Sequence, residues 1–334
     1  GIFTHKCNFF LEKELGVKKC LLTTSCTHAL EISSILLDIK PGDEVILPSF
    51  TFVSTVNAFV IRGAIPVFID IRPDTLNMDE TQLGAMITEK TKTIIPVHYA
   101  GVGCEMDSIM DIANRYDIPV VEDNAHGLFG KYKDRYLGTF GTFATQSFHE
   151  TKNFSCGEGG ALLINDEKYI ERAEIIREKG TNRSKFFRDE VDKYTWVDIG
   201  SSYLPSDILS AFLFAQLEKR DNIQAKRKMI WETYYSELKK WADENNHQLP
   251  YIPDYCEQSY HMFYCLFESK EIRNKFIRYM KENNINTIFH YQPLHTSKMG
   301  KKFGTYSCPE TESVAGRIVR LPFYNELSNQ EQSK

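Results

Sequence analysis

Several kinds of feature are missing from this chain of 334 residues. No apolar segment approaches the roughly 20 residues that a membrane helix needs. Basic residues are not in excess, because 40 lysines and arginines stand against 45 aspartates and glutamates and leave a net charge of −5. This balance is unlike that of most proteins that bind nucleic acid through a basic face. The sequence therefore argues against membrane and nucleic-acid partners.

The cysteines lack the spacing of a metal or redox site. No two of the eight form a CxxC pair, which excludes zinc-ribbon and thioredoxin patterns. We recognise no signal peptide. Scattered cysteines in a chain of this size are typical of small buried side chains in a reducing cytosol, so we expect a cytoplasmic protein without a metal.

The common nucleotide and hydrolase motifs are also absent. Gly101-Val102-Gly103 lacks the third glycine of GxGxxG, and no GxxxxGK[ST] run exists. The patterns HExxH and GxSxG are missing as well. Dehydrogenase, P-loop, metalloprotease and α/β-hydrolase functions therefore have little support.

What is present is an ordinary globular composition, with 42% hydrophobic and 25% charged residues. The length predicts about two domains. The chain begins at Gly1, and its first residues resemble the middle of a domain. We therefore expect a further N-terminal piece in the complete protein.

Apolar runs alternate with amphipathic segments over the first two-thirds of the chain. Helical spacing of apolar residues is clear in 29–39 and 105–116. The alternation predicts βαβ units and hence an α/β fold with a mostly parallel sheet, in which ligands bind beyond the carboxyl ends of the strands. We expect strands at 19–22, 44–47, 65–70, 93–98, 118–122, 142–148 and 161–164, and a helix at 52–62.

The pattern changes after residue 204. Two long helices are expected over 204–245, followed by a strand at 262–268, a helix at 270–283 and a strand at 285–290. This arrangement predicts a smaller α+β domain. We place the large domain at 1–215 and the small domain at 216–334.

Two charged residues follow predicted strands. Asp123 ends the run Ile-Pro-Val-Val-Glu-Asp, where an ionised carboxylate needs a cationic partner such as a protonated pyridine nitrogen. A helix cap or a turn would also explain it. Lys152 follows the next strand and precedes Gly157-Glu158-Gly159-Gly160. In a dry site such a lysine can form a Schiff base, whereas a solvated loop is the ordinary alternative.

A third group of residues suits a phosphate. Ser25-Cys26-Thr27 opens a predicted helix, whose N–H groups and dipole attract anions, although a plain N-cap needs no ligand. Ser147 is placed to add a hydroxyl, and Phe52 to stack on an aromatic ring unless it is a core residue. Together with Asp123 and Lys152, these residues supply the parts that pyridoxal phosphate requires.

Longer runs strengthen this interpretation. The sequence resembles the DegT/DnrJ/EryC1/StrS family of sugar aminotransferases over nearly its whole length. The resemblance implies the aspartate aminotransferase type I fold and pyridoxal 5'-phosphate as cofactor. It is carried by Pro-Gly-Asp-Glu-Val-Ile (41–46), Pro-Ser-Phe-Thr-Phe-Val-Ser-Thr (48–55), Pro-Val-His-Tyr-Ala-Gly (96–101), Val-Glu-Asp-Asn-Ala-His-Gly (121–127), Ser-Phe-His-Glu-Thr-Lys-Asn (147–153) and Gly-Glu-Gly-Gly (157–160).

Three other runs, 177–184, 192–196 and 198–204, resemble one subgroup of that family. This subgroup makes dTDP-4-amino-4,6-dideoxygalactose for enterobacterial common antigen. The resemblance thus implies dTDP-4-keto-6-deoxyglucose as sugar substrate and glutamate as amino donor. It also implies a homodimer whose sites are shared between subunits.

The resemblance also assigns roles residue by residue. Lys152 matches the Schiff-base lysine and Asp123 the partner of the pyridine nitrogen. Phe52 matches the ring stacked on the cofactor, and His126 lies near the cofactor's ring oxygen. Cys26, Thr27 and Ser147 match the phosphate-binding residues, and His290 and Arg183 match segments on the sugar-nucleotide side.

One position departs from the family pattern. Many members have Gly-x-Asn-x-Arg where this chain has Gly-Ser-Ser-Tyr-Leu (200–204). That Asn usually reaches the phosphate of the neighbouring subunit. Ser202 stands in its place with a shorter side chain, so a direct contact across the subunits is in question.

Three alternatives remain open. The substrate can be another nucleotide-linked keto sugar. A dehydratase branch of the family replaces the lysine by histidine, and Lys152 argues against it. A non-catalytic protein on the same scaffold is the third.

Overall fold

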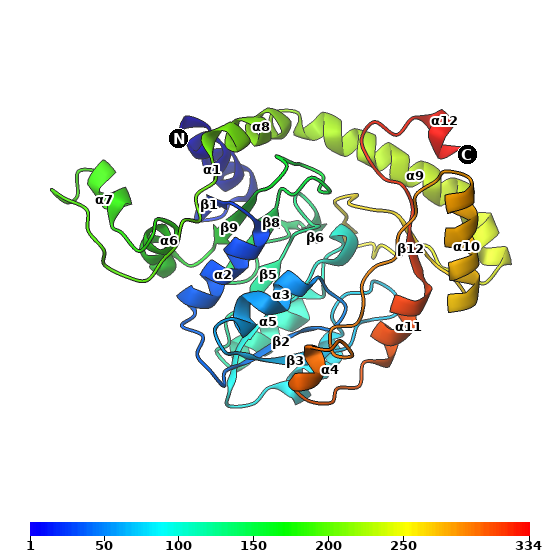
Figure 1. The fold of residues 1–334 in the computed structure, drawn as a ribbon, viewed down its shortest axis with the longest axis horizontal. Coiled ribbons are helices and arrows are strands. Elements are labelled where there is room, and N and C mark those ends of the chain that lie inside the picture. Colours follow the sequence, from blue (N-terminus) through cyan, green and yellow to red (C-terminus); the bar gives the residue numbers. More distant parts are fainter.

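The computed structural model describes all residues from Gly1 to Lys334 (Figure 1). Helices and strands alternate through the first two-thirds, as the apolar pattern predicts. The strands there are β1 (Lys19–Thr23), β2 (Glu44–Pro48), β3 (Ile65–Ile69), β4 (Thr91–Ile94), β5 (Val121–Asp123), β6 (Lys131–Tyr132), β7 (Arg135–Tyr136), β8 (Phe143–Ser147) and β9 (Gly160–Ile164). The helices are α1 (Ile2–Leu15), α2 (Cys26–Leu36), α3 (Val53–Val60), α4 (Glu80–Met86), α5 (Met106–Arg115), α6 (Ile170–Arg177), α7 (Arg183–Phe187) and α8 (Asp207–Leu217).

Seven of these strands form one mixed sheet in the order β1-β9-β8-β5-β4-β2-β3. The pairs β3–β2, β2–β4 and β5–β8 are parallel. Parallel bridges from Ile94 to Val120 and from Val97 to Asp123 join the two halves of the sheet. Only β9 is reversed, being antiparallel to β8 and β1. The predicted α/β fold with a mostly parallel sheet is confirmed.

Helices cover both faces of the sheet, so its strands are buried on both sides. Along β1, Leu21 packs with α2, α3 and α6, whereas Cys20 and Leu22 pack with α1 and α8. Under β2–β4, α4 and α5 close the second face with Leu83 and Ile109 in the core. Two-sided burial explains why these strands read as continuous apolar runs.

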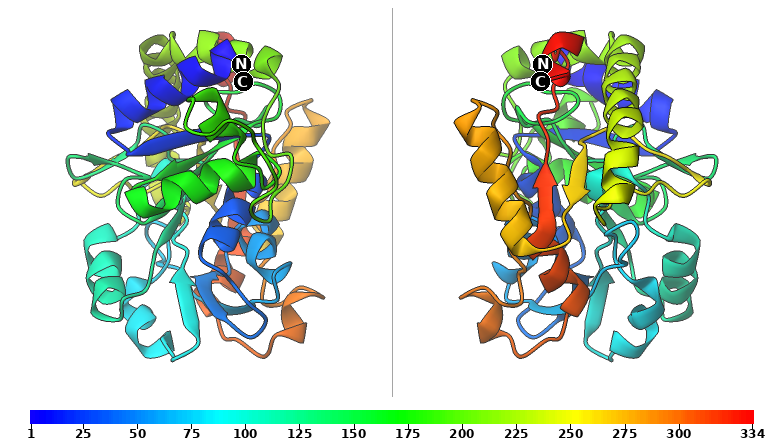
Figure 2. Two further views of the ribbon diagram at one scale, coloured as in Figure 1. Left: turned by 90° about the vertical axis from the view of Figure 1, so that its left-hand side faces the viewer. Right: turned by 90° about the vertical axis from the view of Figure 1, so that its right-hand side faces the viewer.

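The C-terminal third has a core of its own. The long helix α9 (Arg220–Glu244) packs Ile230 and Trp231 against Phe263 and Val319. The other elements are β10 (Cys256–Glu257), β11 (Tyr264–Leu266), α10 (Lys270–Glu282), α11 (Pro309–Arg317), β12 (Ile318–Arg320) and α12 (Asn329–Gln332). Figure 2 shows α10 lying along the antiparallel pair β11–β12. The predicted boundary at 215/216 falls in the last turn of α8 and stays a prediction.

One predicted strand is wrong. Residues 285–290 form no strand and make a single bridge, between Ile288 and Arg320. Ile288 and Phe289 are about half exposed, so this segment lies at an edge where only one residue pairs. The partner of β11 is instead β12, for which no strand was predicted. None of the helices is both long and apolar enough to cross a membrane.

Candidate active site

A cavity of about 630 Å³ lies at the carboxyl ends of β5 and β8. The first turns of α2 and α3 and the loop between β8 and β9 form one part of its wall. Residues 288–291 and 320–323 of the C-terminal third form another part. The structure brings together these residues expected from the sequence: Cys26, Thr27, Phe52, Asp123, His126, Ser147, Lys152 and His290.

Asp123 ends β5 and is only 5% exposed. Its Oδ2 accepts a hydrogen bond from Thr55 Oγ1 at 2.7 Å, and its Oδ1 accepts one from Ala125 N at 3.2 Å. Burial raises the pKa of Asp123, and the two hydrogen bonds and the nearby Lys152 oppose that effect. No cationic side chain lies within 4.0 Å of the carboxylate. A cationic ligand group in the cavity would therefore stabilise it.

Lys152 lies in the loop that reverses the chain between β8 and β9. Phe148 N donates to Gly159 O at 2.7 Å and Glu150 N to Gly157 O at 2.9 Å, which continue the β8–β9 ladder into the loop. Burial lowers the pKa of Lys152 to about 8, and the weaker effects of Cys26 and Asp123 act in the opposite direction. The lowered pKa leaves more neutral amine near neutral pH than an ordinary lysine has, and the neutral amine is the form that acts as nucleophile or proton acceptor.

The start of α2 leaves backbone N–H groups without an acceptor at one corner of the cavity. Ser25 Oγ caps the helix by accepting from His28 N at 3.1 Å. The N–H groups of Cys26 and Thr27 have no acceptor inside the helix, since they belong to its first turn. A Cβ on Gly160 would lie 2.3 Å from Cys26 N, so only glycine lets β9 pass this close to the helix start. Ser147 adds its hydroxyl from the end of β8.

Two aromatic features face the same space. Phe52 precedes α3 and is 56% exposed, which excludes the ordinary core role. The His126 ring stacks on His261 with centroids 4.2 Å apart and lies 6.1 Å from His290. Burial holds the pKa of His126 well below its usual value. Its Nδ1 is buried without a partner and is free for a ligand.

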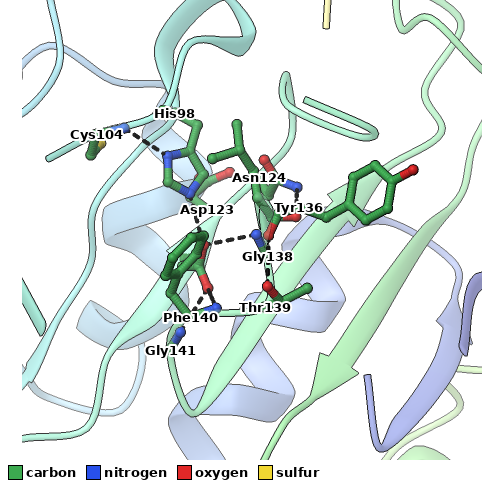
Figure 3. A network of polar contacts seen from close by, with 12 residues as sticks. His98, Cys104, Asp123, Asn124, Tyr136, Gly138, Thr139, Phe140 and Gly141 are labelled. Atoms are coloured by element: carbon green, nitrogen blue, oxygen red, sulfur yellow. Dashed lines mark hydrogen bonds and ion pairs between the residues drawn. The ribbon is translucent and has the colours of Figure 1, made fainter. Parts of the chain in front are cut away.

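A second network fixes β5 from behind the cavity (Figure 3). Glu122, fully buried, accepts from His98 Nε2 at 2.9 Å and from Gly138 N at 2.8 Å through Oε2. Its Oε1 accepts from the N–H groups of Phe140 and Gly141, each at 2.7 Å. His98 Nδ1 accepts from Cys104 N, so Nε2 carries the hydrogen. These hydrogen bonds hold Glu122 in place and thereby fix the position of the next residue of β5, Asp123.

Two of the expected residues lie elsewhere. Ser202 is exposed and bridges to Glu178. Arg183 begins α7, and its guanidinium lies 5.0 Å from the Phe187 ring centroid. The helix α7 extends away from the sheet at the left of Figure 1. Neither residue lines the cavity of its own chain.

Sequence reasoning missed other residues of the site. Thr55 touches Asp123, and Thr51 Oγ1 lies 2.8 Å from Thr55 Oγ1. Their spacing of four at a helix start was a usable signal. No local pattern marks His261, Tyr291 or Arg320, which reach the cavity from the C-terminal third.

His261 is hydrogen-bonded to the loop that carries Lys152. Asn153 Nδ2 donates to Ser259 O at 2.7 Å, which leaves its Oδ1 to accept from His261 Nδ1 at 2.9 Å. Since Asn153 follows Lys152, this pair ties the lysine loop to the C-terminal wall of the cavity.

Comparison with known proteins decides the family. The model of the DegT/DnrJ/EryC1/StrS aminotransferase family matches residues 8–334. The chain belongs to this family. An uncharacterized protein of Methanocaldococcus jannaschii, MJ1066, is 35% identical over 328 residues, which are 95% of this chain and 84% of that protein.

Solved structures of similar proteins agree with this assignment. The putative sugar aminotransferase Spr1654 from Streptococcus pneumoniae, in its PLP form, is 28% identical with a TM-score of 0.91 and spans 100% of this chain and 89% of its own. 3-Amino-5-hydroxybenzoic acid synthase is 25% identical with a TM-score of 0.86, and the match spans 96% and 85% of the two chains. The expected family and fold are confirmed, and the particular subgroup stays a prediction.

Aminotransferases of this family use pyridoxal phosphate, and the cavity fits that cofactor. Asp123 offers an uncompensated carboxylate, the α2 start and Ser147 offer phosphate donors, and Lys152 offers an amine of lowered pKa. These features lie around one cavity, as a single bound molecule requires.

Proposed function

We propose that this family member transfers the amino group of glutamate to the 4-keto carbon of a dTDP-linked 4-keto-6-deoxy sugar. The proposed substrate is dTDP-4-keto-6-deoxyglucose and the product dTDP-4-amino-4,6-dideoxygalactose. The observation that supports the transamination is the convergence of Asp123, Lys152 and the α2 start on one cavity. The runs 177–184, 192–196 and 198–204 support the choice of sugar.

Pyridoxal phosphate, when bound, supplies an electron sink for a carbanion at the amino-bearing carbon. In this proposal Asp123 holds a proton on the pyridine nitrogen, because no cationic side chain lies within 4.0 Å of its buried carboxylate. The start of α2 and Ser147 bind the phosphate group. Phe52 covers one face of the ring, and its exposed position in the cavity suits that role.

Lys152 is proposed to move the proton. In this role its Nζ would accept the proton from the α-carbon of glutamate and release it again within the same site, and would supply a proton to C4 of the sugar in the second half of the reaction. A pKa of about 8 lets the same nitrogen accept and release a proton near neutral pH. Proton transfer by a placed group contributes about 10²–10⁴-fold to a rate.

We also propose the homodimer. Ser202 and Arg183 lie outside the cavity of their own chain, as residues that serve a neighbouring subunit would. The same segment exposes large apolar side chains, with Phe187 66% and Trp196 77% accessible. On α8, Ile208 is 81% exposed and Phe212 59% exposed. A second copy of the chain would cover such surfaces.

The experiment is an absorption titration of the protein loaded with pyridoxal phosphate. We expect a visible band that falls when glutamate is added, and a Lys152→Ala variant that binds the cofactor but gives no turnover. Lys240→Ala, at an exposed position of α9, is the control for loss of a lysine. Near-normal turnover by Lys152→Ala would sink the assignment.

The sugar is tested separately with a panel of nucleotide-linked keto sugars. Amination of dTDP-4-keto-6-deoxyglucose ahead of the others supports the proposed substrate. Preference for a different keto sugar rejects that substrate and keeps the aminotransferase. A protein that binds the cofactor but responds to no amino donor is a non-catalytic member of the family.

A further inference from the structure

Arg320 is a charged residue of the cavity to which the proposed chemistry gives no role. It ends β12 and lines the cavity wall. Of the other charged lining residues, Asp123 and Lys152 are used above, and Glu158 lies 3.4 Å from His149. No carboxylate lies within 4.0 Å of the Arg320 guanidinium. The cavity therefore contains a guanidinium whose charge no side chain compensates.

A short chain of hydrogen bonds holds this guanidinium in place. Nη1 of Arg320 donates to His290 Nε2 at 2.8 Å. Because a guanidinium can only donate, Nε2 must accept and the ring hydrogen must be on Nδ1. Nδ1 therefore donates to Tyr99 OH, 3.1 Å away. His290 also stacks on Tyr291 at a centroid distance of 3.7 Å.

The histidine in this chain adds no charge of its own. Burial, with Arg320 and Lys152 nearby, lowers the pKa of His290 to about 2. A neutral histidine orients the arginine without neutralising it. Both ring nitrogens of His290 are occupied inside the protein, so its part is to position Arg320. Only one of the five N–H donors of the guanidinium is used, and the Nε–H is buried without a partner.

An uncompensated cation in a partly buried cavity calls for an anionic ligand. The phosphate of the cofactor already has a place at the α2 start, which belongs to the large sheet, whereas Arg320 belongs to the β11–β12 pair. Two anions of the proposed reaction remain, the carboxylate of the amino donor and the diphosphate of the nucleotide sugar. A guanidinium matches a carboxylate and a phosphate alike. Arg320 lies close enough to Lys152 to lower the pKa of that amine, which is proposed to act at the α-carbon of the donor, and this proximity favours the donor's carboxylate.

We infer that Arg320, positioned by His290 and Tyr99, binds a carboxylate of the amino donor. This inference rests on the proposed function, because it names the group that selects the donor in the same site. His290 is then a positioning residue for Arg320, which differs from the contact with the sugar nucleotide expected by resemblance.

The test uses the cofactor-loaded protein and glutarate, a dicarboxylate without an amine, as the probe. The dissociation constant is measured by calorimetry for wild type, Arg320→Gln and Arg320→Lys, with Arg115→Gln as the control. Arg115 is exposed on α5 and pairs only with Asp111. We expect Arg320→Gln to weaken glutarate binding about 10- to 100-fold, as lost hydrogen bonds to a charged group do. Arg320→Lys should lose less, and Arg115→Gln nothing.

His290→Gln tests the positioning role. It should raise the glutamate concentration for half-maximal bleaching of the cofactor band and leave the limiting rate within about threefold. A merely structural role would lower the unfolding temperature without this split. If every variant has the wild-type dissociation constant for glutarate and the wild-type response to glutamate, the inference is overturned.

A parallel titration with dTDP distinguishes the other anion. If Arg320→Gln weakens dTDP and leaves glutarate unchanged, the inference is wrong and the guanidinium serves the diphosphate. If glutarate binding depends on Arg320 but glutamate never changes the cofactor band, the inference holds and the proposed function fails. The two failures are therefore distinguishable.

Discussion

Glu122 and Asp123 are neighbours on β5, yet their carboxylates meet opposite environments. Successive side chains of a strand point to opposite faces, so one faces the protein interior and the other the cavity. Glu122 accepts four hydrogen bonds, three of them from the backbone of residues 138–141 and one from His98. Asp123 accepts two, from Thr55 and Ala125.

The difference separates stability from chemistry. Every lone-pair direction of Glu122 is used to hold the protein together, and the residue has no access to a ligand. Asp123 accepts only two hydrogen bonds and lines the cavity, and burial raises its pKa. The same side-chain type thus fixes the strand in one position and is ready for a cationic ligand in the next.

The largest expected effect comes from Asp123→Asn. Turnover should fall about 10²–10⁴-fold, because an amide cannot hold a proton on the pyridine nitrogen. The free energy of unfolding without cofactor should change by less than about 1 kcal/mol, since the amide oxygen can accept from Ala125 N, the NH₂ can donate to Thr55 Oγ1, and the buried charge is removed. Turnover kinetics and urea denaturation measure the two effects. Full activity would remove Asp123 from its role.

Glu122→Gln should give the opposite result. Whichever oxygen of Glu122 the amide NH₂ replaced, it would face N–H donors, so buried N–H groups would lose their acceptor. We expect the free energy of unfolding to fall by about 2–4 kcal/mol in urea titrations. Glu89→Gln, at an exposed site, should stay within about 0.5 kcal/mol. An equally stable Glu122→Gln protein would break the comparison between the two carboxylates.

A smaller effect is expected at the wall of the cavity. In Gly160→Ala the new Cβ would lie 2.3 Å from Cys26 N and from Ser25 C, so the start of α2 must move. The dissociation constant for pyridoxal phosphate should rise, and stability should fall by about 1–3 kcal/mol. Gly84→Ala, in α4 with no atom within 4 Å of the new Cβ, should stabilise by about 0.5–1 kcal/mol. Unchanged cofactor affinity in Gly160→Ala would exclude the α2 start as the phosphate site.

The smallest effect concerns Lys152 in the protein without cofactor. Its folded pKa of about 8 lies below the ordinary value of 10.5. Between these values the unfolded chain keeps the proton and the folded chain does not, so this group makes stability rise with pH across that window. Below about pH 8 the cost of burying the ammonium is complete. Lys152→Met should therefore be more stable than wild type at pH 7.

The measurement is the difference in urea unfolding between Lys152→Met and wild type at pH 7 and pH 10, in which other titrating groups cancel. The advantage of the variant should shrink at the higher pH. A difference that does not change with pH would contradict the burial of this amine.

Much of the large domain could be predicted from local sequence. The apolar runs at 44–47 and 161–164 are strands because both of their faces are buried, and such strands show in the sequence without knowledge of their partners. Asp123 and Lys152 could be singled out because each follows such a run. The first helix was missed although Cys7, Leu11 and Leu15 repeat every four residues and are all buried.

The C-terminal wall of the cavity was harder to predict. Residues 285–290 have the composition of a strand, yet their pairing depends on whether an edge of β12 is available. His261, Tyr291 and Arg320 show no local pattern, because their place depends on packing between segments far apart in the chain. Packing between distant segments also decides that Ser202 and Arg183 do not line the cavity of their own chain.

Local sequence is enough to predict the alternation of strands and helices and the position of Asp123 at the carboxyl end of a strand. These properties follow from the burial and spacing of neighbouring side chains, which are local. The packing of distant segments is needed to bring Arg320, His290 and Lys152 to one cavity, and to enclose Glu122 while Asp123 lines that cavity. Such placement depends on contacts between distant segments, and local spacing carries no information about those contacts.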